Sequence, residues 1–350
     1  MHIPSGCSNR ETSVIIDKIK GLIFGAILGD SIGIATKGFS RDEIKKIYEK
    51  EIRFGMDEKG TEFIRDDYRA CFDENDFGYD AEQILLVIES ILETKGHFQT
   101  KDYSTRLTKY SEHIKDFNHP NYITNPIVRA PILGALKFWD GTSVIENSAS
   151  VCSMTHPDPR YIVSSVILSL LIARVLRGQD LEIQLQPIPT PVHSPHLTSS
   201  FTDSLNTDPT FSILVRDVIE TNKQNFQGAY MHSFFSLGIH PDYYQCLIAC
   251  AQPETLGSLQ LDSTEDVFRS LQAALYCFTR SIPDGQEPDY FKKIIMDLVL
   301  QGGNAESNAT TAGALLGARL GYSQLPTEWV VGMKRWEWLE DRVDEFIALF

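Results

Sequence analysis

Residues 301–317 read Gln-Gly-Gly-Asn-Ala-Glu-Ser-Asn-Ala-Thr-Thr-Ala-Gly-Ala-Leu-Leu-Gly. Two glycines, a group of oxygen-bearing side chains and a run of small residues predict a loop that leads into a helix. The start of a helix presents unpaired N–H groups and the positive end of the helix dipole, which suit anionic ligands. Side chains here that can bind a metal, a ligand or only the helix backbone are Asn304, Glu306, Ser307 and Asn308.

Small residues recur at every fourth position in two parts of the chain. The positions are Ala305, Ala309, Gly313, Gly317 and Gly321 in one part, and Gly21, Gly25, Gly29 and Gly33 in the other. Residues four apart are neighbours on a helix, so each set forms a stripe without bulky side chains. Glycine costs about 1 kcal/mol relative to alanine inside a helix, and close approach of two backbones is the usual compensation. We therefore expect two helices that cross closely in the core.

The composition is that of a globular protein, with 350 residues, 42% hydrophobic and 23% charged, enough for one large domain or two ordinary ones. The formal net charge of −15 repels phosphate, which argues against nucleic acid or an anionic membrane surface as a partner. Residues 1–17 lack the apolar run of a secretion signal, and the six cysteines show no zinc-type pairing. We expect a cytoplasmic protein with reduced thiols, and a nuclear location fits the same pattern.

The pattern along the chain predicts one domain with two irregular segments. Residues 1–12 have the composition of a flexible tail, and residues 186–210 are rich in Pro, Ser and Thr, as in an insertion. Strand-like alternation is scarce, so residues 13–350 are expected to form a single compact all-α domain. Helical patterns occur at residues 14–35, 41–51, 84–92, 103–115, 160–177, 213–222, 240–250, 263–280, 290–301 and 326–350.

Four polar residues are candidates for either a structural or a functional role. Asp30 lies within an apolar helical pattern, and a buried carboxylate needs hydrogen bonds, a metal or a proton. Asp80 precedes a helical pattern, where it is a cap or a ligand. Arg129 can hold an anion with its planar guanidinium or form a surface ion pair. His156 lies in a turn and contacts either a ligand or the backbone.

Several segments together resemble the ADP-ribosylglycohydrolase family. The Gly-Asp-x-x-Gly motif of that family is similar to residues 29–33, and its Asn-Gly-Ser-x-Met-Arg-x-x-Pro segment resembles residues 125–131. Its Thr-His-Pro turn is similar to residues 155–157. Its closing Gly-Gly-Asp-x-Asp-Thr-Asn motif resembles the stretch that begins at Gly302, and Leu-Pro-x-x-Trp follows at residues 325–329. The segments occur in the order of the family and span nearly the whole chain.

The resemblance implies an all-α fold of orthogonally packed helices and hydrolysis of the N- or O-glycosidic bond of ADP-ribosylated substrates. It also implies two Mg²⁺ ions at the starts of two helices, which orient the ribose while a carboxylate-held water attacks the anomeric carbon. The expected partner is ADP-ribose or an ADP-ribosylated protein. The substrate-binding residues that the matching motifs imply are Asp30, Asn125, Arg129, His156, Gly302, Gly303 and Asn308.

The sequence departs from the family at the metal ligands. The Thr-Asp-Asp cluster becomes Gly78-Tyr79-Asp80, and Asp-x-Asp-Thr becomes Asn304-Ala305-Glu306-Ser307. Lys37 stands where many members have a glutamate. The acids that remain supply too little negative charge for two Mg²⁺ ions, so we expect one Mg²⁺ or none. The metal ligands that the resemblance leaves are Asp80, Asn304, Glu306 and Ser307, of which Asp80 and Glu306 are also the expected catalytic residues.

Two functional hypotheses follow, so whether the chain is an enzyme stays open. The first is a Mg²⁺-assisted hydrolase with a degenerate metal site. The second is a catalytically inactive relative that binds ADP-ribose or another nucleotide, or that serves as a scaffold. Asp76 or Glu82 beside Asp80 would favour the enzyme, because either acid could replace a lost ligand. Lys37 or Tyr79 in the metal position would favour the inactive relative.

Overall fold

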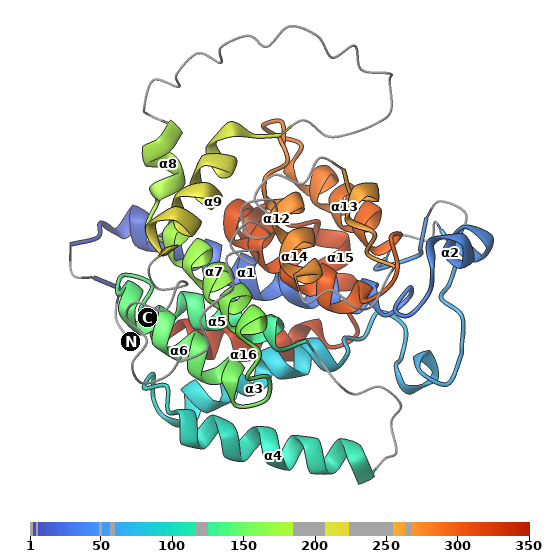
Figure 1. The fold of residues 1–350 in the computed structure, drawn as a ribbon, viewed down its shortest axis with the longest axis horizontal. Coiled ribbons are helices and arrows are strands. Elements are labelled where there is room, and N and C mark those ends of the chain that lie inside the picture. The colour runs from blue at the N-terminus through green and yellow to red at the C-terminus, as the bar shows by residue number, and fades with distance from the viewer. Residues whose placement is uncertain are drawn as a thin grey trace, which may run out of the picture.

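The structure is a computed structural model of the 350-residue chain. It describes residues 3–4, 6–48, 51–56, 60–116, 125–184, 207–223, 255–262 and 268–350. Within these ranges every regular element is a helix, apart from isolated bridges that pair Ile52 with Thr61 and Thr207 with Arg280. The expected all-α fold is therefore confirmed (Figure 1).

The helices follow one another along the chain in two groups. The N-terminal group contains α1 (Asn9–Gly33), α2 (Arg41–Tyr48), η1 (Arg69–Cys71), α3 (Tyr79–Glu93), α4 (Thr100–Asp116), η2 (Pro126–Arg129), α5 (Ala130–Ala135), α6 (Gly141–Ser153), α7 (Pro159–Leu176) and α8 (Gln179–Gln184). The C-terminal group contains α9 (Pro209–Thr221), η3 (Gly257–Leu259), α12 (Arg269–Phe278), α13 (Glu287–Val299), α14 (Ala305–Leu320), η4 (Tyr322–Gln324), α15 (Thr327–Gly332) and α16 (Trp336–Ile347). The helices expected at residues 41–51, 103–115, 160–177 and 290–301 correspond to α2, α4, α7 and α13, with ends that differ by a few residues.

Helices α1 and α14 cross in the middle of the molecule (Figure 1). Their small residues face one another in antiparallel order. A Cβ on Gly25 would lie 2.3 Å from the carbonyl oxygen of Gly313, and a Cβ on Gly29 would lie 2.0 Å from that of Ala309. No side chain fits between backbones at these separations, so the expected close crossing is confirmed.

The first helix begins earlier than the sequence predicts. It starts at Asn9 instead of Val14, so the end of the expected tail at residues 1–12 is helical. The cause is a capping box, in which the hydroxyl of Ser8 accepts a hydrogen bond from the backbone N–H of Glu11 and the carboxylate of Glu11 accepts one from the backbone of Ser8.

Most of the Pro-rich segment expected at residues 186–210 lies outside the described residues. Its C-terminal boundary is wrong, because Thr207 forms a backbone bridge and α9 already begins at Pro209. Asp208 caps this helix with its side chain, and proline suits the first helical position. The helix expected at residues 240–250 also lies outside the described residues.

The helix expected at residues 326–350 is two helices, α15 and α16. The chain leaves the helical conformation after Gly332, where a Cβ would lie 2.4 Å from the Cα of Gly55. The backbone N–H of Lys334 then donates a 3.0 Å hydrogen bond to the carbonyl oxygen of Asn75. These contacts with two loops lie where the chain bends, and Gly332 is the local sequence signal for the end of α15.

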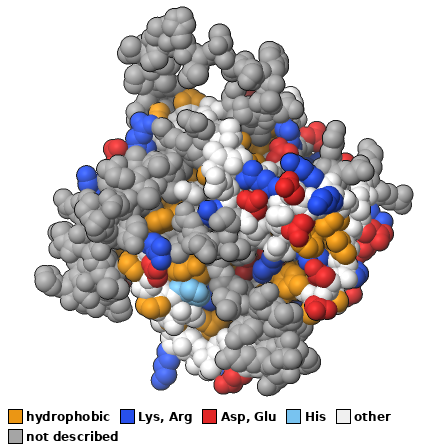
Figure 2. Space-filling view, turned by 45° about the vertical axis from the view of Figure 1, so that its right-hand side comes forward, with side chains coloured by type: hydrophobic (Ala, Val, Ile, Leu, Met, Phe, Trp, Pro, Cys, Tyr) orange, Lys and Arg blue, Asp and Glu red, His pale blue; other side chains and the backbone are white. Residues whose placement is uncertain are grey.

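By its length and composition alone, α7 could span a membrane. However, 78% of this helix is buried inside the fold, as in a core helix. Figure 2 shows that Lys and Arg side chains are interspersed with Asp and Glu side chains over the described part of one face. That part of the surface therefore lacks the continuous basic patch that a nucleic-acid-binding face needs.

Replacing Gly313 with alanine is expected to destabilise the fold. The added Cβ would lie 2.0 Å from the carbonyl oxygen of Gly25. Overpacking typically costs about 1–3 kcal/mol, and at this separation we expect the loss to exceed the gain in helix propensity of about 1 kcal/mol. Urea unfolding measures the difference.

The matched control is Gly141→Ala. Gly141 begins α6, and nothing lies within 4 Å of a Cβ added there, so the free energy of unfolding should stay equal or rise. A Gly313→Ala variant as stable as the wild type would contradict the close crossing.

Candidate acidic site

Three carboxylates from distant parts of the chain meet where α1 and α14 cross. Asp30 comes from α1, Asp80 from the first turn of α3 and Glu306 from the first turn of α14. One carboxylate oxygen of each lies within 4.8 Å of the others, and all three residues are 0% exposed. The close crossing explains the grouping, because the Cα of Glu306 lies 2.5 Å from where a Cβ on Gly33 would be.

Each of the three carboxylates has one oxygen that accepts a hydrogen bond and one that does not. The hydrogen-bonded oxygens are Oδ2 of Asp30, which accepts from the N–H of Gly78, Oδ2 of Asp80, which accepts from Ser307, and Oε2 of Glu306, which accepts from Lys37 and Tyr68. The buried oxygens without a donor are Oδ1 of Asp30, Oδ1 of Asp80 and Oε1 of Glu306. Three such oxygens in one place are a site for a cation or for an added proton.

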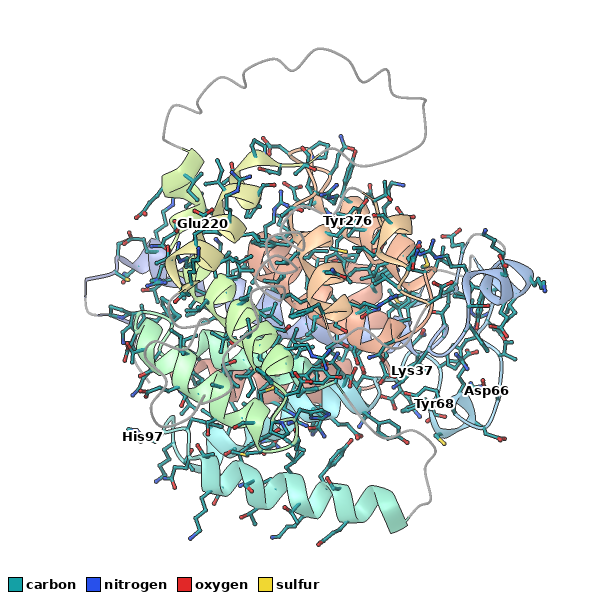
Figure 3. All side chains as sticks on the ribbon, viewed as in Figure 1. Lys37, Asp66, Tyr68, His97, Glu220 and Tyr276 are labelled. Atoms are coloured by element: carbon teal, nitrogen blue, oxygen red, sulfur yellow. The ribbon has the colours of Figure 1, made fainter. Side chains whose placement is uncertain are left out.

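Lys37 brings a positive charge into this site. Its ammonium lies 2.8 Å from Oε2 of Glu306 and 3.1 Å from the hydroxyl of Tyr68, which lies beside it (Figure 3). Only 14% of the Lys37 side chain is exposed. Arg69 fixes the backbone that carries Lys37, since its guanidinium donates to the carbonyl oxygens of Ala35, at 2.9 Å, and of Lys37. The ion pair is therefore part of the buried structure.

Burial and charge change the pKa values of the three acids. The pKa of Asp30 is raised well above its ordinary value, first by burial and then by the charges of Glu306 and Asp80. Burial and the charge of Glu306 raise the pKa of Asp80 to about 7. Burial has the same tendency at Glu306, but the ion pair and hydrogen bond with Lys37 hold its pKa below the ordinary value. Glu306 is therefore the ionised member, and Asp30 is the acid that most readily keeps a proton.

The residues present fit one divalent cation better than two. The three ionised acids carry −3 and Lys37 adds +1, which leaves −2, the charge that one divalent ion neutralises. A second ion would leave an excess of +2 in a buried site, where unpaired charge is costly. Mg²⁺ prefers six oxygens at about 2.0–2.1 Å and usually keeps several waters, so three carboxylate oxygens that close slightly around it are a suitable set.

The expected metal ligands are brought together in part. Asp80, Glu306 and Ser307 lie in the cluster, where Ser307 orients Asp80 through the hydrogen bond described above. The third carboxylate is Asp30, which the resemblance assigned to substrate binding. Asn304 is half-buried before α14, and its side chain does not cap that helix.

Tyr68 and Arg69 are contacts that the sequence analysis missed. Both lie in the charged, irregular stretch before α3, where no motif or periodicity marks them. The one available signal is Lys37, because a buried lysine needs hydrogen-bond acceptors and a fixed backbone. The hydroxyl of Tyr68 accepts from its ammonium, and Arg69 donates to its carbonyl oxygen.

Gly78 and Glu306 depart from the family pattern together, and their contact explains why. A Cβ on Gly78 would lie 2.8 Å from Oε1 of Glu306. Glutamate is longer than the aspartate of the motif by one C–C bond of about 1.5 Å, and the missing side chain at residue 78 provides the space. A side chain at residue 78 would therefore crowd the carboxylate of Glu306.

Asn125 and Asn308, two of the expected substrate-binding residues, are linked through Ser270. Nδ2 of Asn125 donates a 3.0 Å hydrogen bond to the hydroxyl of Ser270, which donates a 2.7 Å bond to Oδ1 of Asn308. Nδ2 of Asn308 is buried without an acceptor. Since Asn308 follows Ser307 in the first turn of α14, this amide is a donor that a ligand near the cluster can use.

Arg129 and His156 meet at Thr155. Arg129 is buried and donates to Gln83 at 3.0 Å and to the hydroxyl of Thr155 at 2.8 Å, so it is not a surface ion pair. Nδ1 of His156 lies 2.9 Å from the same hydroxyl, and its ring packs edge-on against Tyr161. Burial and the charge of Arg129 lower the pKa of His156. The expected substrate contacts of both residues stay predictions.

Gly302 and Gly303 have φ values of 76° and 64° and pack the loop before α14 against the chain that follows α1. A Cβ on Gly302 would lie 2.1 Å from the carbonyl oxygen of Phe39, and Gly303 donates a 2.9 Å hydrogen bond to the same carbonyl. These contacts hold the start of α14 against the segment that carries Lys37. The expected contact of the two glycines with a substrate stays a prediction.

Asp76 and Glu82 do not join Asp80. Asp76 accepts a 2.7 Å hydrogen bond from Arg335, and Glu82 accepts a 2.7 Å bond from the hydroxyl of Tyr110. Of the residues that the sequence raised as possible neighbours of the metal site, Lys37 is the one whose side chain contacts a clustered acid.

Two curated proteins match a short part of the chain. A stretch of 66 residues is 39% identical to ADP-ribosylhydrolase ARH3 of Bos taurus and 38% identical to ADP-ribosylhydrolase ARH3 of Homo sapiens. The stretch is 18% of this chain and 18% of each relative, so the chain matches less than a fifth of their length.

A solved structure named ADP-ribosylglycohydrolase-related protein complex has the same fold. It aligns with 96% of this chain and 99% of its own chain, with a TM-score of 0.57 and 16% sequence identity. The sequence model of the ADP-ribosylglycohydrolase family matches residues 11–350. The chain therefore belongs to the ADP-ribosylglycohydrolase family.

Proposed function

We propose that this chain binds an ADP-ribosyl group with the help of one divalent cation and does not hydrolyse the glycosidic bond. The observation that carries the proposal is the buried ion pair between Lys37 and Glu306, 2.8 Å long. The ammonium supplies positive charge that a second metal ion supplies in the family pattern. Family membership supports ADP-ribosylated molecules as the class of ligand.

Each side chain of the site has a role in this function. The unbonded oxygens of the three acids would hold the ion, which, when bound, supplies a Lewis-acidic contact to ligand oxygens. Lys37 orients Glu306, and Ser307 orients Asp80. The free amide of Asn308 donates to a hydroxyl of the ligand.

Slow hydrolysis at this one-cation site is the second candidate function. Asp80 favours it, because burial raises the pKa of this carboxyl in the metal-free site, which makes its carboxylate a stronger base than that of an exposed aspartate. In that role its carboxylate takes a proton from the water that attacks the anomeric carbon, where oxocarbenium character develops. The Lys37–Glu306 pair opposes this function, since an ammonium, unlike a second metal ion, cannot coordinate ligand oxygens as a Lewis acid.

Isothermal titration of ADP-ribose with and without Mg²⁺ tests the proposal. We expect one binding site and an affinity at least about tenfold higher with Mg²⁺, which corresponds to about 1.4 kcal/mol. No binding of ADP-ribose under either condition would contradict the proposal. Release of ADP-ribose from ADP-ribosyl-serine and ADP-ribosyl-arginine peptides is expected to stay at background, and clear turnover would assign the second candidate instead.

Replacing Lys37 with methionine is expected to strengthen Mg²⁺ binding at least about tenfold. Methionine is an unbranched side chain one atom shorter than lysine, and it removes a positive charge close to the ion. Two unit charges about 4 Å apart interact by about 4 kcal/mol at an effective dielectric of about 20. The rise of the unfolding temperature with Mg²⁺ concentration measures the affinity.

The matched control is Lys20→Met. Lys20 is also mostly buried, with 16% of its side chain exposed, and its 2.9 Å ion pair is with Glu340. Its replacement should leave the Mg²⁺ affinity unchanged. Equal Mg²⁺ affinities for the wild type and Lys37→Met would show that the ammonium does not take the place of a metal charge.

A double-mutant cycle tests the compensation between Gly78 and Glu306. Gly78→Ala alone is expected to cost about 1–3 kcal/mol, because the new Cβ would lie 2.8 Å from Oε1 of Glu306. In the background of Glu306→Asp the same change should cost less, with a coupling energy of about 0.5–3 kcal/mol measured by urea unfolding. Additive effects of the two changes would show that the departures are independent.

A further inference from the structure

A cavity of about 500 Å³ opens beside the acidic site, and none of the three clustered acids lines it. Its walls come from the stretch between η1 and α3, the first turns of α3, one residue of α4 and the start of α16. The volume is within the range of about 300–1,000 Å³ that ligand pockets occupy. The function proposed above does not use this cavity, and the inference below does not rest on that function.

Aromatic rings form much of the cavity wall. They are the side chains of Phe72, Phe77, Tyr79, Tyr110 and Trp338. The rings of Phe72 and Tyr79 meet edge-on at 5.1 Å, and those of Phe77 and Trp338 stack at 6.4 Å. Trp338 is 44% exposed, so a large aromatic surface is accessible at the entrance. The faces of aromatic rings attract cations.

The charge of the cavity also favours a cation. The acidic residues of the wall are Asp73, Asp76, Glu82 and Glu89, and the basic residue of the wall among the described residues is Arg335. Four carboxylates carry −4. Arg335 adds +1, and Lys334 and Arg342, which pair with Asp73 and Glu89, add +2, which leaves −1 when all are ionised.

These acids already have donors from their own chain. Asp76 accepts from Arg335 at 2.7 Å, and Glu82 accepts from Tyr110 at 2.7 Å. Asp73 is paired with Lys334, and Glu89 lies 3.1 Å from Arg342. The cavity therefore attracts a ligand by its negative charge and its aromatic ring faces. Its acids have few oxygens left to accept hydrogen bonds from a ligand.

We propose that this cavity binds a quaternary ammonium group. A primary ammonium has three N–H donors and a guanidinium has five, and each donor needs an acceptor when it is buried. A quaternary ammonium has none, so a negative field and aromatic faces satisfy it completely. The chain itself shows that the rings accept a positive group, because the guanidinium carbon of Arg335 lies 3.7 Å from the ring centre of Phe77.

Titration of the full-length protein with choline tests the proposal, with 3,3-dimethyl-1-butanol as the neutral molecule of the same shape. We expect choline to bind at least about tenfold more tightly than the alcohol, because the aromatic faces attract its positive charge. Equal affinities, or no binding of choline and of a trimethyllysine peptide, would overturn the proposal. A peptide that binds more tightly than choline assigns the group to a modified protein, and the reverse order assigns it to a small molecule.

Two variants separate this site from a general loss of structure. Trp338→Ala should weaken choline binding about tenfold, whereas Trp139→Ala, at a different cavity, should leave it unchanged. Arg335→Ala should tighten choline binding several-fold, because it removes the cation that competes for the ring of Phe77. Weaker binding by correctly folded Arg335→Ala, or no effect of Trp338→Ala, would contradict the assignment.

Discussion

The contact between the backbones of α1 and α14 is the constraint on which the acidic site depends. Helices normally pack with their axes about 8–10 Å apart, separated by side chains. Here the facing positions carry glycine or alanine, and an added Cβ at Gly29 would lie 2.0 Å from the carbonyl oxygen of Ala309. This approach lets Asp30, near the end of α1, reach Glu306 at the start of α14. The glycines cost helix propensity, and the packing of two buried helices offsets that cost.

Burying three carboxylates together is unfavourable unless their charge is compensated. The fold compensates part of it with one donor for an oxygen of each acid, and with Lys37 as a fixed positive charge. What remains is an excess of negative charge and three oxygens without donors. One oxygen of each acid lies within 4.8 Å of the others, a spacing that suits one ion. The three acids could therefore hold one cation, and Lys37 places a fixed positive charge beside that position.

The first turns of α3 serve two sites because a helix has two faces. Asp80 points toward the acidic cluster, whereas Tyr79, Glu82, Leu86 and Glu89 line the aromatic cavity. Spacings of three and four residues place these four side chains on one side of the helix. Asp80 and Glu82 are two positions apart, which is why a nearby acid in the sequence does not replace a lost metal ligand at the cluster.

Helical periodicity and capping are local properties, so the fold class, the two stripes of small residues and the acids Asp80 and Glu306 at helix starts could be predicted from the residues alone. The folded chain was needed to show that Asp30 joins these acids, that Lys37 is the ion-pair partner of Glu306, and that Gly78 makes room for the longer side chain of Glu306. The structure also divides the last helix, where contacts with other loops accompany the break. The earlier start of α1, in contrast, follows from the local capping box of Ser8 and Glu11. The site depends on residues far apart along the chain, such as Asp30 with Gly78, 48 positions away, and with Glu306, 276 positions away, and no local pattern records such distances.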